Sequence, residues 1–108
     1  MKLIFNNMVF PNPIDDGTEY ATIGNLAYNE KIVTETELKK GWTYTISVSD
    51  GEISNDTRLY IDGMVSTIAY LSMDTAVQFT APVTGYVTVL NKDKSNSVKN
   101  LIIQIKAL

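Results

Sequence analysis

The clearest pattern in the sequence is a strict alternation of large apolar and small hydroxyl side chains over residues 42–49. This stretch consists of Trp42, Thr43, Tyr44, Thr45, Ile46, Ser47, Val48 and Ser49. A repeat of two residues predicts a β-strand with one face in the core and the other in water. Residues 39–41 and 50–51 each end in glycine, and they predict turns before and after this strand.

Similar alternation between turn residues predicts further strands at residues 57–61, 65–71, 75–80, 85–91 and 98–107. Asp62 and Gly63 predict a hairpin turn between the first two of these. Pro82 ends the third, because proline has no N–H to donate to a sheet. Residues 92–97 predict an exposed loop. The last strand carries one continuous apolar face, formed by Leu101, Ile103, Ile105 and Ala107. We expect it to be paired inside a sheet, because an open apolar edge invites aggregation.

The first third of the chain has weaker patterns. Residues 3–10 and residues 31–38 predict one strand each, and residues 14–29 predict either a loop or a short hairpin. Residues 35–40 are compatible with one helical turn, but no 3.6-residue period persists for three turns. Seven to nine short strands predict an all-β fold, namely a two-sheet antiparallel sandwich of jelly-roll-like type, with a small barrel as the alternative. We expect residues 1–108 to form a single domain.

Composition narrows the classes of function. Apolar residues make up 44% of the chain and charged residues 19%, as in ordinary folded proteins. The net charge is −3 and Arg58 is the sole arginine, so we expect no nucleic-acid binding. The chain has no cysteine, which excludes disulfides, thiolate zinc sites and cysteine nucleophiles. No apolar run reaches the length of about 18 residues that a membrane helix needs, so no membrane partner is expected.

Three segments resemble a known family of modules. They are Leu38-Lys39-Lys40-Gly41-Trp42-Thr43-Tyr44-Thr45-Ile46-Ser47, then Phe79-Thr80-Ala81-Pro82-Val83-Thr84-Gly85-Tyr86-Val87-Thr88-Val89, and Val98-Lys99-Asn100-Leu101-Ile102-Ile103-Gln104. Together they resemble the jelly-roll modules of bacteriophage virion proteins (tail, baseplate, head-fibre or capsid decoration), which are similar to carbohydrate-binding modules. The likeness covers about residues 31–106. It implies a jelly-roll fold and a role in the virion.

The chain also departs from these modules at its ends. The modules are commonly part of a longer chain, whereas this sequence begins at Met1 and ends at Leu108. It lacks the acidic residue and glycine with which tail modules often continue. The expectation is therefore a complete small protein, such as a capsid decoration protein or a small tail accessory.

Catalysis is not expected. The chain has no histidine, which excludes nucleophiles that rely on an imidazole base. Two acidic clusters remain: Asp15, Asp16 and Glu19 around Gly17, and Asp50, Glu52 and Asp56 around Gly51. A pair of carboxylates can in principle supply an acid and a base. Asp-Gly sequences are more typical of solvated turns, and we interpret both clusters in that way.

Calcium is the other chemistry that these carboxylates suggest. Hard oxygen ligands in a loop suit Ca²⁺, and the resemblance implies that such modules often carry one structural calcium ion. Residues 50–56 lack the spacing of an EF-hand loop. We expect no metal and no cofactor, with a structural calcium ion as the alternative.

The aromatic side chains are the candidate contact residues. Trp42 and Tyr44 share the strand face of Ile46 and Val48, so both are predicted to lie in the core. Tyr60, Tyr70 and Tyr86 each adjoin aliphatic residues that should face inward. We therefore predict that these three tyrosines point outward and contact a protein partner or a glycan.

The sequence thus predicts a bacteriophage virion structural protein, either a capsid decoration or auxiliary protein or a tail or fibre accessory. It would act by protein–protein assembly with other virion proteins and would form a homo-oligomer. The alternative is a carbohydrate-binding module that recognises a host surface glycan. A small glycosidase or lyase is the least favoured, because the catalytic groups are so poorly provided.

Overall fold

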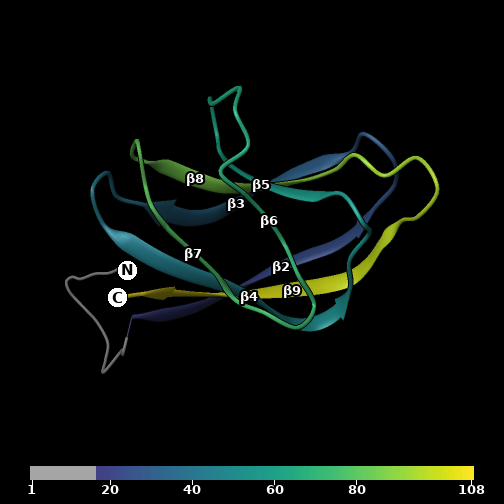
Figure 1. The fold of residues 1–108 in the computed structure, drawn as a ribbon, viewed down its shortest axis with the longest axis horizontal. Coiled ribbons are helices and arrows are strands. Elements are labelled where there is room, and N and C mark those ends of the chain that lie inside the picture. The colour runs from purple at the N-terminus through teal and green to yellow at the C-terminus, as the bar shows by residue number, and fades with distance from the viewer. Residues whose placement is uncertain (1–16) are drawn as a thin grey trace.

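The computed structural model describes residues 17–108, which form eight strands in two facing antiparallel sheets (Figure 1). The strands are β2 (Thr18–Leu26), β3 (Lys31–Leu38), β4 (Thr43–Glu52), β5 (Thr57–Ile61), β6 (Ala69–Tyr70), β7 (Val77–Thr80), β8 (Gly85–Asn91) and β9 (Val98–Ala107). One sheet has the order β2-β9-β4-β7 and the other β3-β8-β5-β6. No helix occurs in the described range. The strand predicted at residues 3–10 lies outside the described residues.

The pairing of the strands is nested along the chain. Strand β2 pairs with β9, β3 with β8, β4 with β7, and β5 with β6, as in one long hairpin. Wrapping this hairpin around a common core adds the pairs β4 with β9 and β5 with β8. This is the arrangement of an eight-stranded jelly roll. The prediction of an all-β, two-sheet antiparallel sandwich of jelly-roll-like type is confirmed.

Apolar side chains from both sheets fill the space between them. The most deeply buried include Ile46 of β4, Ile61 of β5, Val89 of β8, and Leu101 and Ile103 of β9, each 0% exposed. On β4, β5 and β9 these residues alternate with side chains that are less buried, such as Thr45, Tyr60 and Ile102. The apolar residues whose alternation predicted the strands are therefore the residues that form the core.

Several predicted boundaries agree with the structure and others do not. The strands predicted at residues 31–38, 57–61, 85–91 and 98–107 are found with the same ends. The strand predicted at residues 42–49 runs through the expected turn at Gly51 and ends at Glu52. Strand β7 begins at Val77, two residues later than predicted. The helical turn considered at residues 35–40 is absent, because β3 continues to Leu38 and places that side chain in the core at 1% exposure.

The structure contradicts the prediction in two segments. Residues 65–71 contain only the short strand β6, and Val65 is 96% exposed. A two-residue turn at Asp62-Gly63 would have placed the polar Ser66 opposite buried Leu59, whereas the observed register places Ala69 there. Residues 14–29, expected to form a loop or short hairpin, contain the nine-residue strand β2.

The two ends of the sandwich differ. The β2–β3, β4–β5 and β8–β9 loops (residues 27–30, 53–56 and 92–97) gather at one end, which we call the tip (Figure 1). The turn at residues 39–42 and the loop at residues 81–84 lie at the opposite end. Ala107 donates its backbone N–H to the Gly17 carbonyl there at 3.0 Å. The tip and this terminal end are therefore separated by the length of the strands.

Candidate interaction surface

All three candidate tyrosines lie on the outer face of the sheet β3-β8-β5-β6. Tyr60 belongs to β5, Tyr70 to β6 and Tyr86 to β8. Tyr70 is 55% exposed and Tyr86 is 44% exposed, whereas Tyr60 is partly buried. The outward direction predicted from their aliphatic neighbours is confirmed by this burial pattern.

The strand register places the three tyrosines in successive rows across the sheet. Arg58 lies opposite Tyr70, Tyr60 lies opposite Thr88, and Tyr86 is the next outward residue along β8 from Thr88. Val33 of the edge strand β3 also lies opposite Thr88 and is 41% exposed. We call the surface formed by Val33, Arg58, Tyr60, Tyr70 and Tyr86 the tyrosine face.

Arg58 is held in a fixed position on the tyrosine face. Its Nε and Nη2 atoms donate to the two carboxylate oxygens of Asp56 at 2.7 and 3.0 Å. The guanidinium carbon lies 5.5 Å from the centre of the Tyr70 ring, within the range of a cation–π contact. The hydrogen bond from Arg58 lowers the pKa of Asp56, and the same bond raises the pKa of Arg58. The pair is therefore charged at neutral pH.

Tyr60 is fixed by the β5–β6 loop, which folds back over this sheet. The Thr67 hydroxyl donates to the Tyr60 phenol oxygen at 3.1 Å, and this bond is the main reason that the pKa of Tyr60 is lowered. Met64 of the same loop lines a small hollow of about 160 Å³ with Tyr60 and Leu90. Tyr70 and Tyr86 are thus the freely accessible rings of the tyrosine face.

Trp42 was predicted to lie in the core, and this prediction is wrong. The side chain is 53% exposed, and the residue precedes the first residue of β4. Its backbone carbonyl accepts from the N–H of Ala81 in the turn region at the terminal end. Tyr44 is buried as predicted, at 5% exposure, and its phenol oxygen accepts from the backbone N–H of Lys39 at 2.8 Å.

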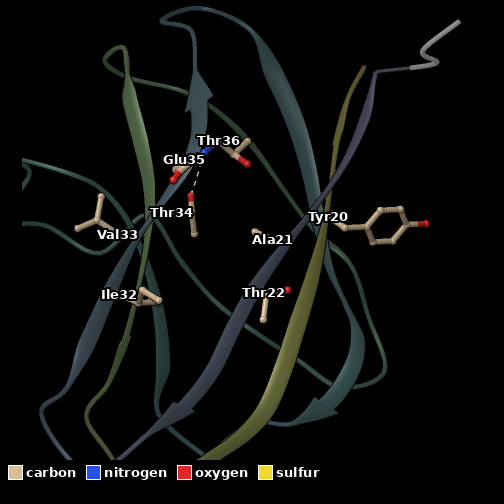
Figure 2. Close-up of a pocket in the computed structure, with 8 residues that line it drawn as sticks. All are labelled: Tyr20, Ala21, Thr22, Ile32, Val33, Thr34, Glu35 and Thr36. Atoms are coloured by element: carbon tan, nitrogen blue, oxygen red, sulfur yellow. Dashed lines mark hydrogen bonds between the residues drawn. The ribbon is translucent and has the colours of Figure 1, made fainter. Parts of the chain in front are cut away.

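A groove of about 300 Å³ runs between the edge strands β2 and β3, which belong to different sheets. Figure 2 shows Tyr20 and Val33 pointing away from this groove on opposite sides. Thr34 donates to the Val87 carbonyl at 2.8 Å and accepts from the N–H of Thr36 at 3.2 Å. The Thr34 side chain therefore supplies a hydrogen bond to β8 where the regular pairing of β3 stops.

The acidic residues do not assemble into a metal site in the described range. No group of three or more carboxylate, histidine or cysteine side chains among residues 17–108 is placed to hold a metal ion. Asp56 is engaged by Arg58, Asp50 accepts from the N–H of Gly51, and Glu19 accepts from the Thr36 hydroxyl. Asp15 and Asp16 lie outside the described residues. The carboxylates predicted as the second cluster, Asp50, Glu52 and Asp56, are therefore not brought together as ligands.

The tip contains a buried polar network that the sequence patterns did not reveal. Asn91 is 0% exposed; its Oδ1 accepts from the Ser54 hydroxyl at 2.7 Å, and its Nδ2 donates to the carbonyls of Leu26 and Asn96, each at 3.0 Å. These bonds join the end of β2 to the β4–β5 and β8–β9 loops. One sequence feature could have indicated the burial of Asn91: it lies two residues after Val89 and four after Val87, so it shares their inward face of β8.

Asp93 ties the β4–β5 loop to the β8–β9 loop. Its carboxylate accepts from the backbone N–H groups of Ser95 at 2.8 Å and of Asn55 at 3.0 Å. These two bonds are the main causes of its lowered pKa. The tip loops are thus held by a buried amide and a charged carboxylate.

The chain matches no family model, no curated protein and no solved structure. None of the elements in residues 17–108 is a helix of the length and apolarity needed to cross a membrane. The likeness to virion jelly-roll modules therefore stays a prediction drawn from the sequence motifs.

Proposed function

We propose that this protein is a structural component of a bacteriophage virion, either a capsid decoration or auxiliary protein or a tail or fibre accessory. It acts by protein–protein assembly with other virion proteins, and it forms a symmetric homo-oligomer there. The sequence motifs and the jelly-roll strand order support this choice. No catalytic activity is part of the proposal, in keeping with the absence of histidine from the chain.

The observation that carries the proposal is the grouping of Arg58, Tyr60, Tyr70 and Tyr86 on one sheet face. Tyrosine and arginine are enriched in protein interfaces and are prominent among the residues that dominate binding energy. The contacts of Arg58 with Asp56 and Tyr70 fix its side chain before a partner arrives. Fixed side chains lose little entropy on binding, so this surface is suited to protein contact.

Co-sedimentation with virions of the phage that encodes the gene tests the proposal. We expect the wild-type protein to sediment with the particles and the Tyr70→Ala/Tyr86→Ala variant to bind roughly tenfold more weakly or worse. Tyr20→Ala is the matched control, because Tyr20 is 62% exposed on the outer face of the other sheet. A wild-type protein that stays in the supernatant, or an equal loss in the control, would contradict the proposal.

A second candidate function is recognition of a host surface glycan. The observation that favours it is that the rings of Tyr70 and Tyr86 stand half exposed on a sheet face, where sugar rings can stack. A glycan array with the same variants separates the two functions. Glycan binding that is lost in Tyr70→Ala/Tyr86→Ala, without binding to virions, would favour the second candidate.

A further inference from the structure

A hollow of about 190 Å³ opens at the terminal end of the sandwich. The buried side chains of Leu38, Tyr44 and Ile105 line it, and they come from both sheets. Gly17 and Trp42 line it as well. This hollow, which we call the terminal hollow, therefore lies over the end of the hydrophobic core.

Large apolar side chains are exposed at the same end. Trp42 is 53% exposed, Val83 is 40% exposed and Leu108 is 67% exposed. The Trp42 carbonyl accepts from the N–H of Ala81, two residues before Val83, and the N–H of Leu108 donates to the carbonyl of Thr43, each at 2.9 Å. Tryptophan is mostly buried in folded proteins, and a group of exposed apolar side chains marks a contact site. The terminal hollow therefore has the character of a docking surface for an apolar segment.

The chain itself contains such a segment. Residues 3–10 lie outside the described residues; six of these eight are apolar, none is charged, and their sequence predicts a strand. An apolar strand without a partner invites aggregation, so this segment needs an apolar surface to cover it. The chain connects the segment to Gly17, which itself lines the terminal hollow. The segment is therefore tethered beside a surface of the kind it needs.

The tether favours the segment of the same molecule over that of a neighbouring one. Residues 11–16 connect the segment to Gly17 and can span at most about 20 Å. A short tether gives the attached segment an effective concentration in the range of about 1 mM, well above that of a second molecule in dilute solution. Pro11 and Pro13 restrict the backbone of the tether, which reduces the entropy lost on docking.

We propose that residues 3–10 dock into the terminal hollow of their own molecule and pack against Trp42. The apolar side chains of the segment cover the Trp42 ring and close the end of the core above Leu38 and Tyr44. The driving force is the removal of apolar surface from water on both sides of the contact. The inference does not rest on the proposed virion function, because the terminal hollow shares no residue with the tyrosine face.

The fluorescence of Trp42 tests this docking, because Trp42 is the sole tryptophan of the chain. The test variant is Phe5→Asn/Phe10→Asn. These two residues lie on opposite faces of a strand, so one contact is lost whichever face docks. The matched control, Asn6→Ser/Asn7→Ser, changes polar residues on both faces of the same segment. Acrylamide should quench Trp42 roughly twofold more strongly in the test variant, because the ring loses its apolar cover, and equally in the control and the wild type.

Limited proteolysis gives the reciprocal test from the side of the hollow. Chymotrypsin cleaves after accessible aromatic residues, and a docked segment is protected. The variant Trp42→Ala should therefore be cleaved after Phe5 roughly tenfold faster than the wild type. Tyr20→Ala is the matched control, because Tyr20 is also an exposed aromatic residue but does not line the hollow. Mass spectrometry identifies the cleaved bond, and cleavage confined to residues 1–16 shows that the sandwich remains folded.

Three results would overturn the proposal. One is equal quenching of Trp42 in the wild type and in Phe5→Asn/Phe10→Asn. Another is cleavage after Phe5 that is as fast in the wild type as in Trp42→Ala. The third is a smaller molar mass of Phe5→Asn/Phe10→Asn than of the wild type by light scattering, which would place the segment on a neighbouring molecule. A wild-type protein that does not sediment with virions changes none of these results, so the two proposals fail separately.

Discussion

Gly51 lies where β4 bulges against β9. The register shifts between Val48 and Asp50 and again between Asp50 and Glu52, and Gly51 has a φ of +87°. A β-carbon built on Gly51 would overlap the backbone carbonyl of Asn100 on the facing strand. Glycine is therefore required here both for the backbone conformation and for the close approach of the two strands.

Replacing Gly51 by alanine should cost about 3 kcal/mol or more of unfolding free energy, because the strands must separate to admit the methyl group. Gly41→Ala is the control: Gly41 has a similar φ of +88° but open space around it. Only the conformational cost of about 1–2 kcal/mol applies there. Urea unfolding measures both variants, and equal losses would show that the contact with Asn100 is unimportant.

Asp93 should make the stability of the protein depend on acid pH. Its pKa in the folded chain is lowered below the usual 3.8, so the folded state binds the proton less readily than the unfolded state does. The stabilisation is complete at pH values above the pKa that Asp93 has in the unfolded chain. It is lost as the pH falls through the lower pKa that Asp93 has in the folded chain. The melting temperature of the wild-type protein should therefore fall between about pH 5 and pH 2.

The variant Asp93→Asn should melt at a lower temperature at neutral pH and lose part of this acid dependence. Thermal unfolding followed by circular dichroism across that pH range measures both effects. Because Asp56 also has a lowered pKa, some acid dependence will remain in the variant. Parallel curves for the two proteins would rule out a contribution from Asp93.

At the scale of elements, the pairing of the edge strand β3 with β8 is interrupted at its centre. The register with β8 shifts between Val33 and Glu37, so regular pairing stops over the residues between them. The Thr34 hydroxyl takes the place of a backbone donor to the Val87 carbonyl. Bulges and charged side chains on an edge strand discourage pairing with other chains.

Thr34→Val should cost about 1–2 kcal/mol of unfolding free energy, because the Val87 carbonyl and the Thr36 N–H both lose a partner while the side-chain shape is kept. Thr22→Val on the neighbouring edge strand β2 is the control, since Thr22 is exposed and its hydroxyl has no bond to the described residues. Denaturant unfolding compares the two. A loss in Thr22→Val as large as in Thr34→Val would show that the loss does not come from the hydrogen bonds.

The same elements show what the sequence could predict. Strands β4 and β9 were predictable because apolar and polar residues alternate in them with little interruption. Strand β2 was not predictable in this way. One of its inward residues is the small Ala21, and the bulges on either side of Gly24 interrupt the two-residue repeat of apolar positions. The short β6 has a register that places the partly buried Ala69 opposite Leu59 and is followed by the buried Leu71, and this register cannot be predicted without knowing the partner strand.

The candidate site was predictable only in part. Outward tyrosines follow from alternation, but their meeting on one sheet depends on which strands become neighbours. Trp42 is exposed because β4 begins one residue later, at Thr43. The ends of strands are the part of a fold that sequence patterns predict least reliably. The tip network joins Ser54 to Asn91 across 37 residues, so no local pattern could indicate it.

At the scale of the whole molecule, β9 holds the first sheet together. It lies between β2 and β4, and these neighbours come from distant parts of the chain. A chain that ends at Ser97 would leave both neighbours without their main pairing partner and would remove Leu101, Ile103 and Ile105 from the core. We expect it not to fold.

Far-ultraviolet circular dichroism and the dispersion of amide NMR signals check this expectation. Removal of Leu108 alone is the control, because that residue makes one backbone bond to Thr43 and is 67% exposed. The control should keep its strand content. A folded chain without β9 would show that the nested pairing is not needed.

The nested pairing also decides how the molecule bears load. Thr18 at the start of β2 lies opposite Lys106 near the end of β9, so a pull on these two ends acts across the ladder between them. Bonds in an antiparallel ladder run perpendicular to the strands. Such a pull opens them one after another like a zipper, at low force. In the proposed virion role, tension would therefore have to pass through the broad surfaces of the sandwich and not through its ends.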